Sequence, residues 1–284
     1  MLFKINFNKN LKHMRFTLIF VISCLSLALQ AQDPNFHIYL CFGQSNMEGH
    51  AKVESRDSIG ISQRFKVMQT VDCGAKTKGE WYQAVPPLTR CHTGLSPADY
   101  FGRTMLEQLP QNITIGIINV SVGGCKIELF DKDGYEAYVQ SSPDWLKNTV
   151  KQYDGNPYGR LIEMAKIAQK QGVIKGILMH QGESNNGDST WPSKVKKVYD
   201  NIHVDLQLAP NTLPLLAGEL VNFDQNGACA GMNAIIATLK DYIPKAHIVP
   251  SQGCEGVPDR LHFSAAGYRE LGRRYAATML GISK

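Results

Sequence analysis

The chain has 284 residues, of which 43% are hydrophobic and 19% are charged, and its formal net charge is +5. This length and composition are sufficient for one large hydrophobic core. Four basic residues and no acidic residue lie in the first 31 positions, so the remainder carries a formal charge of +1. A nearly neutral chain argues against nucleic acid or an anionic membrane surface as the main partner.

The first 31 residues have the pattern of a secretory signal peptide. A basic head contains Lys4, Lys9, Lys12 and Arg15. An almost wholly apolar stretch follows over residues 16–29, and Ala31 ends a site of small residues. The apolar stretch is shorter than the roughly 20 residues of a membrane-spanning helix. We therefore expect cleavage after Ala31 or Ala28, a secreted or periplasmic location without membrane insertion of the mature chain, and one domain over residues 32–284.

Six strand-like runs alternate with helix-like segments, which predicts a parallel sheet covered by helices on both faces. Most runs are continuously apolar, as expected for strands buried on both faces. The predicted strands are Phe36–Phe42, Phe65–Val71, Ile113–Val120, Val173–His180, Leu213–Leu220 and His247–Val249. The predicted helices are Ser96–Leu109, Tyr158–Gln171, Trp191–Leu208, Met232–Tyr242 and Ser264–Leu280. Residues 55–62, 72–93 and 130–155 fit no element well and are expected to form functional loops at the carboxyl ends of the strands.

Seven cysteines become six if the leader is removed, and an even number in an exported protein permits disulfides. Six cysteines allow 15 complete pairings, so the sequence does not determine their connectivity. Cys73 with Cys91 and Cys229 with Cys254 are the favoured pairs, because they lie in loop-like sequence. Cys41 lies within the first strand and is expected to be a small buried apolar residue.

The first strand stops at Gly43 and is followed at once by Ser45, in the stretch FHIYLCFGQSNMEG. A serine hydroxyl is a weak nucleophile unless a neighbouring base takes its proton and hydrogen-bond donors stabilise the developing oxyanion. Taken alone, Ser45 is most simply the cap of a following helix. A catalytic role requires a base and donors from elsewhere in the chain.

Two later strands also end in motifs that could supply such groups. Gly123 and Gly124 follow the third strand, where a glycine lets a backbone N–H point into a cleft. HQGESN, residues 180–185, follows the fourth strand and provides an amide donor, Gln181, and a carboxylate, Glu183. Taken singly, a Gly-Gly pair is more often an ordinary tight turn, and the polar cluster is as often a simple strand-to-loop transition.

Asp259 and His262 are three residues apart, just before the last predicted helix, in PDRLHFSAAGY. On a single turn the two side chains lie on one side, so Asp259 can accept from Nδ1 of His262 while Nε2 faces outward as a base. An isolated pair of this kind is usually an ordinary helix-entry turn. The motifs carry more weight together, because they occur in order and at the ends of predicted elements.

In this order, GQSNM, GG, HQGES and DxxH resemble the sequence blocks of the SGNH hydrolases, and specifically carbohydrate esterase family 6 and the sialate O-acetylesterases. The resemblance covers essentially the whole mature chain. GQSNM joined to HQGE is specific, whereas GG and DxxH are not. The resemblance implies a flavodoxin-like three-layer α/β/α fold with a central parallel sheet of about five strands. It also implies removal of acetyl groups from sugar hydroxyls, without a metal or an organic cofactor.

The same resemblance implies roles for individual residues. Ser45 would be the nucleophile and His262 the general base. The backbone N–H groups of Ser45 and Gly124 would form the oxyanion hole together with the side-chain amide of Gln181, because HQGE replaces the asparagine-containing block of other SGNH enzymes.

Two carboxylates are candidates for orienting His262. The DxxH spacing favours Asp259, and Glu183 of the HQGE block is the rival. Both could contribute.

Candidate substrate-binding residues lie in the long predicted loops. Four aromatic residues there could stack on sugar rings, although aromatic residues at such positions more often pack the core: Trp81, Tyr82, Tyr135 and Trp145. Trp81 and Tyr82, together with Arg90, are the candidates for substrate contacts.

The leading hypothesis is a secreted serine esterase that deacetylates plant polysaccharide such as acetylated xylan. One alternative keeps the chemistry but acts on O-acetylated sialic acid, for which a local arginine such as Arg90 or Arg103 would provide a partner. The other alternative is a non-catalytic carbohydrate-binding protein on an esterase fold.

Overall fold

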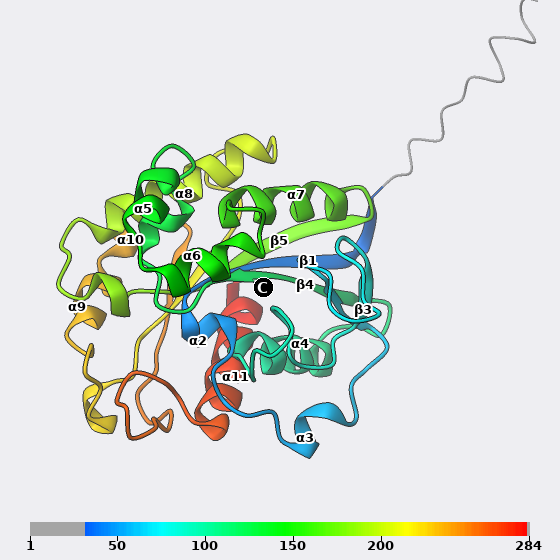
Figure 1. The fold of residues 1–284 in the computed structure, drawn as a ribbon. Coiled ribbons are helices and arrows are strands. Elements are labelled where there is room, and N and C mark those ends of the chain that lie inside the picture. Colours follow the sequence, from blue (N-terminus) through cyan, green and yellow to red (C-terminus); the bar gives the residue numbers. More distant parts are fainter. Residues whose placement is uncertain (1–31, 283–284) are drawn as a thin grey trace, which may run out of the picture. The chain divides into compact units, whose positions relative to one another are not determined.

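A seven-stranded sheet forms the centre of the computed structural model, which describes residues 32–282 (Figure 1). The strand order is β3-β2-β4-β1-β5-β6-β7, and every neighbouring pair is parallel except β2 and β3. The predicted signal peptide lies outside the described residues. Within these residues, no helix combines the length and apolar character needed to cross a membrane.

The strands are β1 Asp33–Gly43, β2 Phe65–Met68, β3 Trp81–Gln83, β4 Thr114–Ser121, β5 Gly172–His180, β6 Leu215–Gly218 and β7 Ala246–Val249. The α-helices are α2 Ser45–Glu48, α3 Ser55–Ser58, α4 Pro97–Gln108, α5 Tyr135–Ser141, α6 Asp144–Lys151, α7 Pro157–Gln169, α8 Trp191–Asp205, α9 Met232–Ala237, α10 Leu239–Tyr242 and α11 Ala265–Ile282. Three short 3₁₀ helices are η1 Ile127–Phe130, η2 Glu183–Asn185 and η3 Phe223–Gln225.

The central strand β1 explains why the strand sequences are continuously apolar. Ile38, Leu40 and Phe42 face one hydrophobic core, and Tyr39 and Cys41 face a second core on the other side of the sheet. Helices α7 and α8 pack on the first face, and α4 and α11 on the second (Figure 1). The predicted three-layer α/β/α fold is thus confirmed, with seven strands rather than about five.

The structure differs from the predicted elements in several places, and one of them is the predicted loop 55–62, which contains helix α3. Strand β3 lies within the predicted loop 72–93, where only three half-buried residues pair antiparallel with β2 at the sheet edge. The predicted loop 130–155 contains α5 and α6, and α6 is anchored through Leu146 and Val150, which are buried one helical turn apart. The predicted helix Met232–Tyr242 divides at Thr238 into α9 and α10.

One of the two favoured disulfides is present. Cys73 and Cys91 are bonded, whereas Cys229 and Cys254 are free, so the second predicted pair is wrong. The physical reason is that Cys254 belongs to the core on the α4 and α11 side of the sheet, whereas Cys229 packs against the opposite core. Cys41 is fully buried, as predicted.

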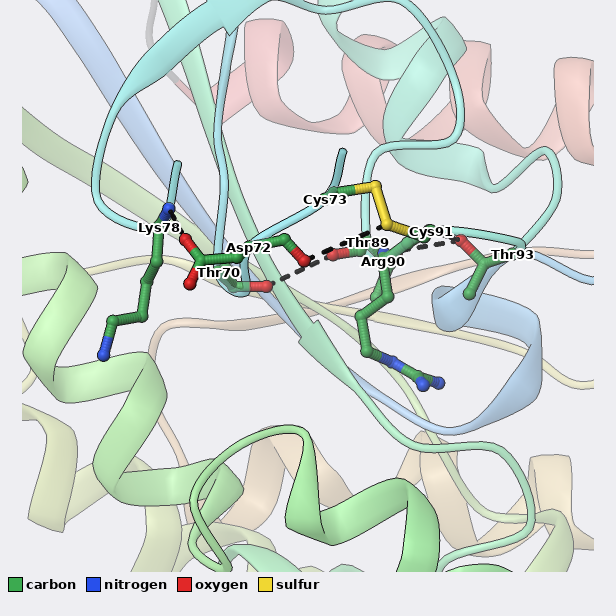
Figure 2. Close-up of a disulfide and its surroundings, with 8 residues drawn as sticks. All are labelled: Thr70, Asp72, Cys73, Lys78, Thr89, Arg90, Cys91 and Thr93. Atoms are coloured by element: carbon green, nitrogen blue, oxygen red, sulfur yellow. Dashed lines mark hydrogen bonds between the residues drawn. A yellow bond between two sulfur atoms is a disulfide. The ribbon is translucent and has the colours of Figure 1, made fainter. Parts of the chain in front are cut away.

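The disulfide holds the loop that carries Arg90 (Figure 2). Hydrogen bonds on both sides of Arg90 restrict the same loop. The Thr70 hydroxyl donates to the Thr89 carbonyl at 3.2 Å, and the Thr93 hydroxyl donates to the Arg90 carbonyl at 2.9 Å. The position of Arg90 is therefore set by its backbone as well as by its side chain.

The register of the three central strands determines where the site forms. Gly43 at the end of β1 pairs with Ser121 of β4 on one side and with His180 of β5 on the other. The residues after these three strands therefore emerge next to one another at the carboxyl edge of the sheet, where open α/β sheets bind ligands.

Candidate active site

Ser45 is the first residue of α2, two residues after the end of β1. Gly43 makes this close packing possible, because its φ is +153° and a Cβ there would lie 2.1 Å from the carbonyl oxygen of His180. Only glycine avoids this clash. The tight turn from β1 into α2 thus presents the Ser45 hydroxyl at the sheet edge.

Ser45, His262 and Asp259 form a continuous hydrogen-bonded chain. Nε2 of His262 is 2.8 Å from Oγ of Ser45, and Nδ1 is 2.7 Å from Oδ2 of Asp259. The other oxygen of Asp259 accepts from the backbone N–H groups of Leu261 and His262 at 2.8 and 3.0 Å. Partial burial would raise the pKa of Asp259, but these hydrogen bonds outweigh it and hold the pKa below its usual value. The carboxylate is therefore charged at neutral pH.

Of the two candidate acids, only Asp259 contacts His262. Glu183 is buried, and its Oε1 accepts from Nδ2 of Asn46 at 2.5 Å. The same Asn46 nitrogen donates to the Leu261 carbonyl at 2.9 Å. Glu183 therefore contacts the helix that begins with Ser45 and, through Asn46, the turn that carries His262.

Two backbone N–H groups beside Ser45 are available to a ligand. Among the described residues, neither the Ser45 N–H nor the Gly124 N–H has a protein acceptor. Gly124 has a φ of +68°, and a Cβ there would lie 2.6 Å from Cη2 of Trp145. The Ser184 hydroxyl donates to the Gly124 carbonyl at 2.9 Å and fixes this peptide. The structure thus brings together both predicted backbone donors.

Gln181 lies beneath the site rather than in it, which differs from its predicted position. Its side chain is buried, and Nε2 donates to Gln44 Oε1, the Cys125 carbonyl and Asn185 Oδ1. Oε1 of Gln181 accepts from the indole N–H of Trp191. With every polar atom engaged in the interior, Gln181 has no donor left for an oxyanion.

Gln44, and not Gln181, has its side chain at the cavity beside Ser45. Its Oε1 accepts from Gln181 and from the backbone N–H groups of Gly182 and Ser184 at 3.1, 3.4 and 3.3 Å. Because backbone N–H groups can only donate, this network fixes which end of the amide is the oxygen. The amide nitrogen remains without an acceptor among the described residues, and Gln44 borders the cavity at Ser45. Its position directly before the serine in GQSNM was a signal that could have identified it.

A cavity of about 450 Å³ opens over Ser45. It is lined by Gln44, Ser45, Glu48, His50, Arg90, Gly123, Gly124, Trp145, Thr149, Glu183, Ser184, Leu261 and His262. A second cavity of about 950 Å³ shares Glu48, His50 and Arg90 with the first, so the two adjoin. Space for a substituent larger than an acetyl group therefore continues past the serine.

The predicted substrate-contacting residues separate into two groups. Arg90 borders both cavities, but its guanidinium is paired with Glu48 and lies 5.5 Å from the Tyr153 ring centre. Trp81 and Tyr82 line neither cavity: Trp81 packs against Phe36, and the Tyr82 hydroxyl accepts from the Thr77 N–H. Both belong to the edge strand β3, which lies within the predicted loop 72–93.

Trp145 places its indole ring at the cavity. It lies on α6 with 56% of its surface exposed, next to Gly124. Leu146 and Val150 of the same helix are buried, so the helix is anchored while its tryptophan stays open to solvent.

His50, Asp259 and His262 are close enough together to suggest a metal site, but their geometry does not suit one. The rings of His50 and His262 are stacked, with centroids 3.6 Å apart and planes inclined by 10°. Imidazole lone pairs lie in the ring plane, so two stacked rings do not converge on one ion. Both nitrogens of His262 are also engaged, by Ser45 and Asp259.

At the carboxyl edge of the sheet, Ser45, His262 and Asp259 have the hydrogen-bonding geometry of a serine hydrolase triad. The family model described as carbohydrate esterase, sialic acid-specific acetylesterase matches residues 35–281. The chain belongs to this family.

Solved structures share the fold at low sequence identity. A protein of Arabidopsis thaliana is 20% identical with a TM-score of 0.66, over 88% of this chain and 99% of that one. NanS is 16% identical with a TM-score of 0.62, over 88% and 98%. A carbohydrate acetylesterase from Xanthomonas citri is 18% identical with a TM-score of 0.61, over 86% of this chain and 57% of that protein.

Proposed function

We propose that this chain is a carbohydrate O-acetylesterase in which Ser45 is the nucleophile, His262 the general base and Asp259 the residue that orients the base. The observation that carries the proposal is the hydrogen-bonded chain from Asp259 through His262 to Ser45, with two free backbone N–H groups beside the serine. The family membership supports an acetyl ester as the bond that is cleaved.

The geometry suits a two-step acyl transfer. His262 takes the Ser45 proton as Oγ attacks the acetyl carbonyl, and the ring then donates that proton to the departing sugar oxygen. Water, deprotonated by the same nitrogen, then attacks the acetyl-serine. The bond between the carbonyl carbon and Oγ breaks, the ring returns the proton to Oγ, and acetate is released. The Ser45 and Gly124 N–H groups and the Gln44 amide stabilise the oxyanion in both steps, and the charged Asp259 stabilises the imidazolium.

For the substrate we favour an acetylated neutral polysaccharide such as xylan. Trp145 offers an exposed ring on which a sugar can stack, and the adjoining cavity leaves room for neighbouring sugar units. The Arg90 charge at the serine is already paired with Glu48, so it is not free to bind a carboxylate.

O-acetylated sialic acid is the second candidate, favoured by the description of the matched family. Lys52 lines the adjoining cavity and could pair with the sialate carboxylate there.

An acetate-release screen tests the function and separates the substrates. Wild-type protein and Ser45→Ala are incubated with acetylated xylan, pectin, glucomannan and O-acetylated sialoglycan, and free acetate is measured. The proposal predicts release by the wild type, fastest on xylan, and none above background with Ser45→Ala. Equal release by both proteins would refute the assignment of Ser45, and preference for sialoglycan would select the second substrate.

Export of the mature chain is part of the proposal. The Cys73–Cys91 disulfide supports it, because such bonds persist mainly in oxidising compartments. Cell fractionation tests it, and recovery of the uncleaved chain with reduced cysteines from the cytoplasm would contradict it.

A further inference from the structure

The catalytic histidine is not held by its two hydrogen bonds alone. The His50 ring lies parallel to the His262 ring at 3.6 Å between centroids, so it covers one face of the imidazole. The hydrogen bonds to Ser45 and Asp259 act on the edges of the ring and still permit it to tilt about the line that joins them. A flat partner on the ring face opposes this tilt.

The backbone around His50 is rigidly attached to its neighbours. The Gly94 N–H donates to the Gly49 carbonyl, and the Leu95 N–H donates to the Ala51 carbonyl, both at 2.7 Å. The His50 backbone also interacts with the buried Tyr268 hydroxyl, which in turn donates to Asn46 Oδ1 at 2.5 Å. His50 therefore projects from a backbone fixed on both sides and tied to the helix that carries Ser45.

We propose that His50 is a positioning residue. It holds the His262 ring in the plane that serves both Ser45 and Asp259, and it presents a neutral aromatic face to the imidazolium formed during the reaction. An aromatic face attracts a cation stacked on it, so the contact strengthens when His262 gains the serine proton. The proposal rests on the proposed function, because it assigns His50 a task in serine activation.

The charges around His50 are consistent with a neutral ring. Partial burial and the neighbouring His262 lower the pKa of His50, whereas Asp259 and Glu48 act in the opposite direction with smaller effect. Three further basic residues line the adjoining cavity that His50 borders: Lys52, Arg90 and His92. A positive charge on His50 would repel the imidazolium of His262. The lowered pKa of His50 favours the neutral ring and so avoids this repulsion.

The test measures serine reactivity with a probe that needs no sugar-binding site. Diisopropyl fluorophosphate modifies an activated serine, and its second-order rate of inactivation is measured for wild type, His50→Ala, His50→Phe and His247→Ala. His247 lies on β7 and lines neither cavity, so it controls for the loss of a histidine elsewhere. Melting temperatures verify folding, and kcat and KM are measured on an aryl acetate.

Three results are expected together. His50→Ala lowers the inactivation rate and kcat by about tenfold, a fraction of the 10²–10⁴ of general-base catalysis, with KM little changed. His50→Phe restores most of both rates, because it supplies the flat face without a charge. His247→Ala reacts at the wild-type rate.

Two results would overturn the inference. One is inactivation of His50→Ala at the wild-type rate, and the other is a His50→Phe variant as slow as His50→Ala although both fold. If the reagent does not modify Ser45 in the wild type, the proposed function is refuted, and the inference with it. This outcome is distinct from either variant result.

Discussion

At the scale of single residues, the site separates two carboxylates by what they contact. Asp259 contacts His262, the proposed base, whereas Glu183 contacts Asn46, the residue after Ser45. We expect Asp259→Asn to lower kcat on an aryl acetate by about 10³-fold or more, because the amide favours the wrong tautomer of His262. Glu183→Gln should lower kcat far less, since its oxygen can still accept from Asn46. Equal losses in the two variants would contradict this division.

Substitution of Gln44 can test the proposed oxyanion site while keeping the hydrogen bonds that the Gln44 side chain accepts from the backbone. In Gln44→Glu, one carboxylate oxygen can still accept from Gly182 and Ser184, but the amide donor is replaced by an acceptor. We expect kcat to fall by about 10²-fold or more, the effect of losing one oxyanion donor. Gln181→Ala, in contrast, should mainly lower the melting temperature, because it removes a buried hydrogen-bond network. Steady-state kinetics and thermal melts on both variants measure this contrast.

Trp145 tests the side of the cavity that would hold the sugar. Removing an exposed ring that stacks on a sugar should cost about 1 kcal/mol of binding, which is roughly fivefold in KM. We therefore expect Trp145→Ala to raise KM on acetylated xylo-oligosaccharides by about this factor and to leave aryl acetate kinetics nearly unchanged. A uniform loss on both substrates would show that the ring supports the serine rather than the sugar.

At the scale of elements, helix α4 begins with a capping box formed by Ser96 and Asp99. The Ser96 N–H donates to Asp99 Oδ2 at 3.1 Å, while Oδ1 of Asp99 is buried without a partner. Burial raises the pKa of Asp99 to about 7. The folded state therefore holds this proton more tightly than the unfolded state, in which an aspartate titrates near 4.

The sign of the resulting pH dependence follows from this difference. Between about pH 4 and pH 7, the folded chain binds more protons than the unfolded chain at Asp99, so the free energy of unfolding falls as the pH rises. Asp99→Asn keeps an acceptor for the Ser96 N–H. In this variant the free energy of unfolding should no longer fall by a few kcal/mol between these pH values. Urea denaturation at pH 5, 6, 7 and 8 measures it. Parallel pH profiles for wild type and variant would contradict the assignment.

The long elements could be predicted from sequence and the short ones could not. Most of β5 is buried, including every residue from 176 to 180, and its apolar sequence indicates this directly. Strand β3 has three residues and is held by pairing with β2, so its sequence carries no periodicity of its own. Helix α6 has buried residues only at Leu146 and Val150, within a stretch rich in turn-forming residues. Its formation depends on packing that the sequence does not display.

At the scale of the whole molecule, the same distinction applies to the site. The structure brings Ser45, Gly124, Asp259 and His262 together, as expected from local motifs whose geometry follows from a strand end or a single turn. The choice between Gln44 and Gln181 depends on which amide faces solvent after β1 and β5 align, and that is a tertiary property. The pairing of Cys229 with Cys254 was wrong for a similar reason, because the two sulfurs belong to opposite faces of the sheet.

The proposed mechanism depends on Ser45 as the nucleophile and on His262 as the base that activates it. The most direct measurement is mass spectrometry of the chain after reaction with diisopropyl fluorophosphate. The proposed mechanism predicts one adduct, on the peptide that contains Ser45, in the wild type. It predicts no adduct in Ser45→Ala and little in His262→Ala. An adduct on another serine, or labelling of Ser45 that continues at the wild-type rate in His262→Ala, would contradict the claim.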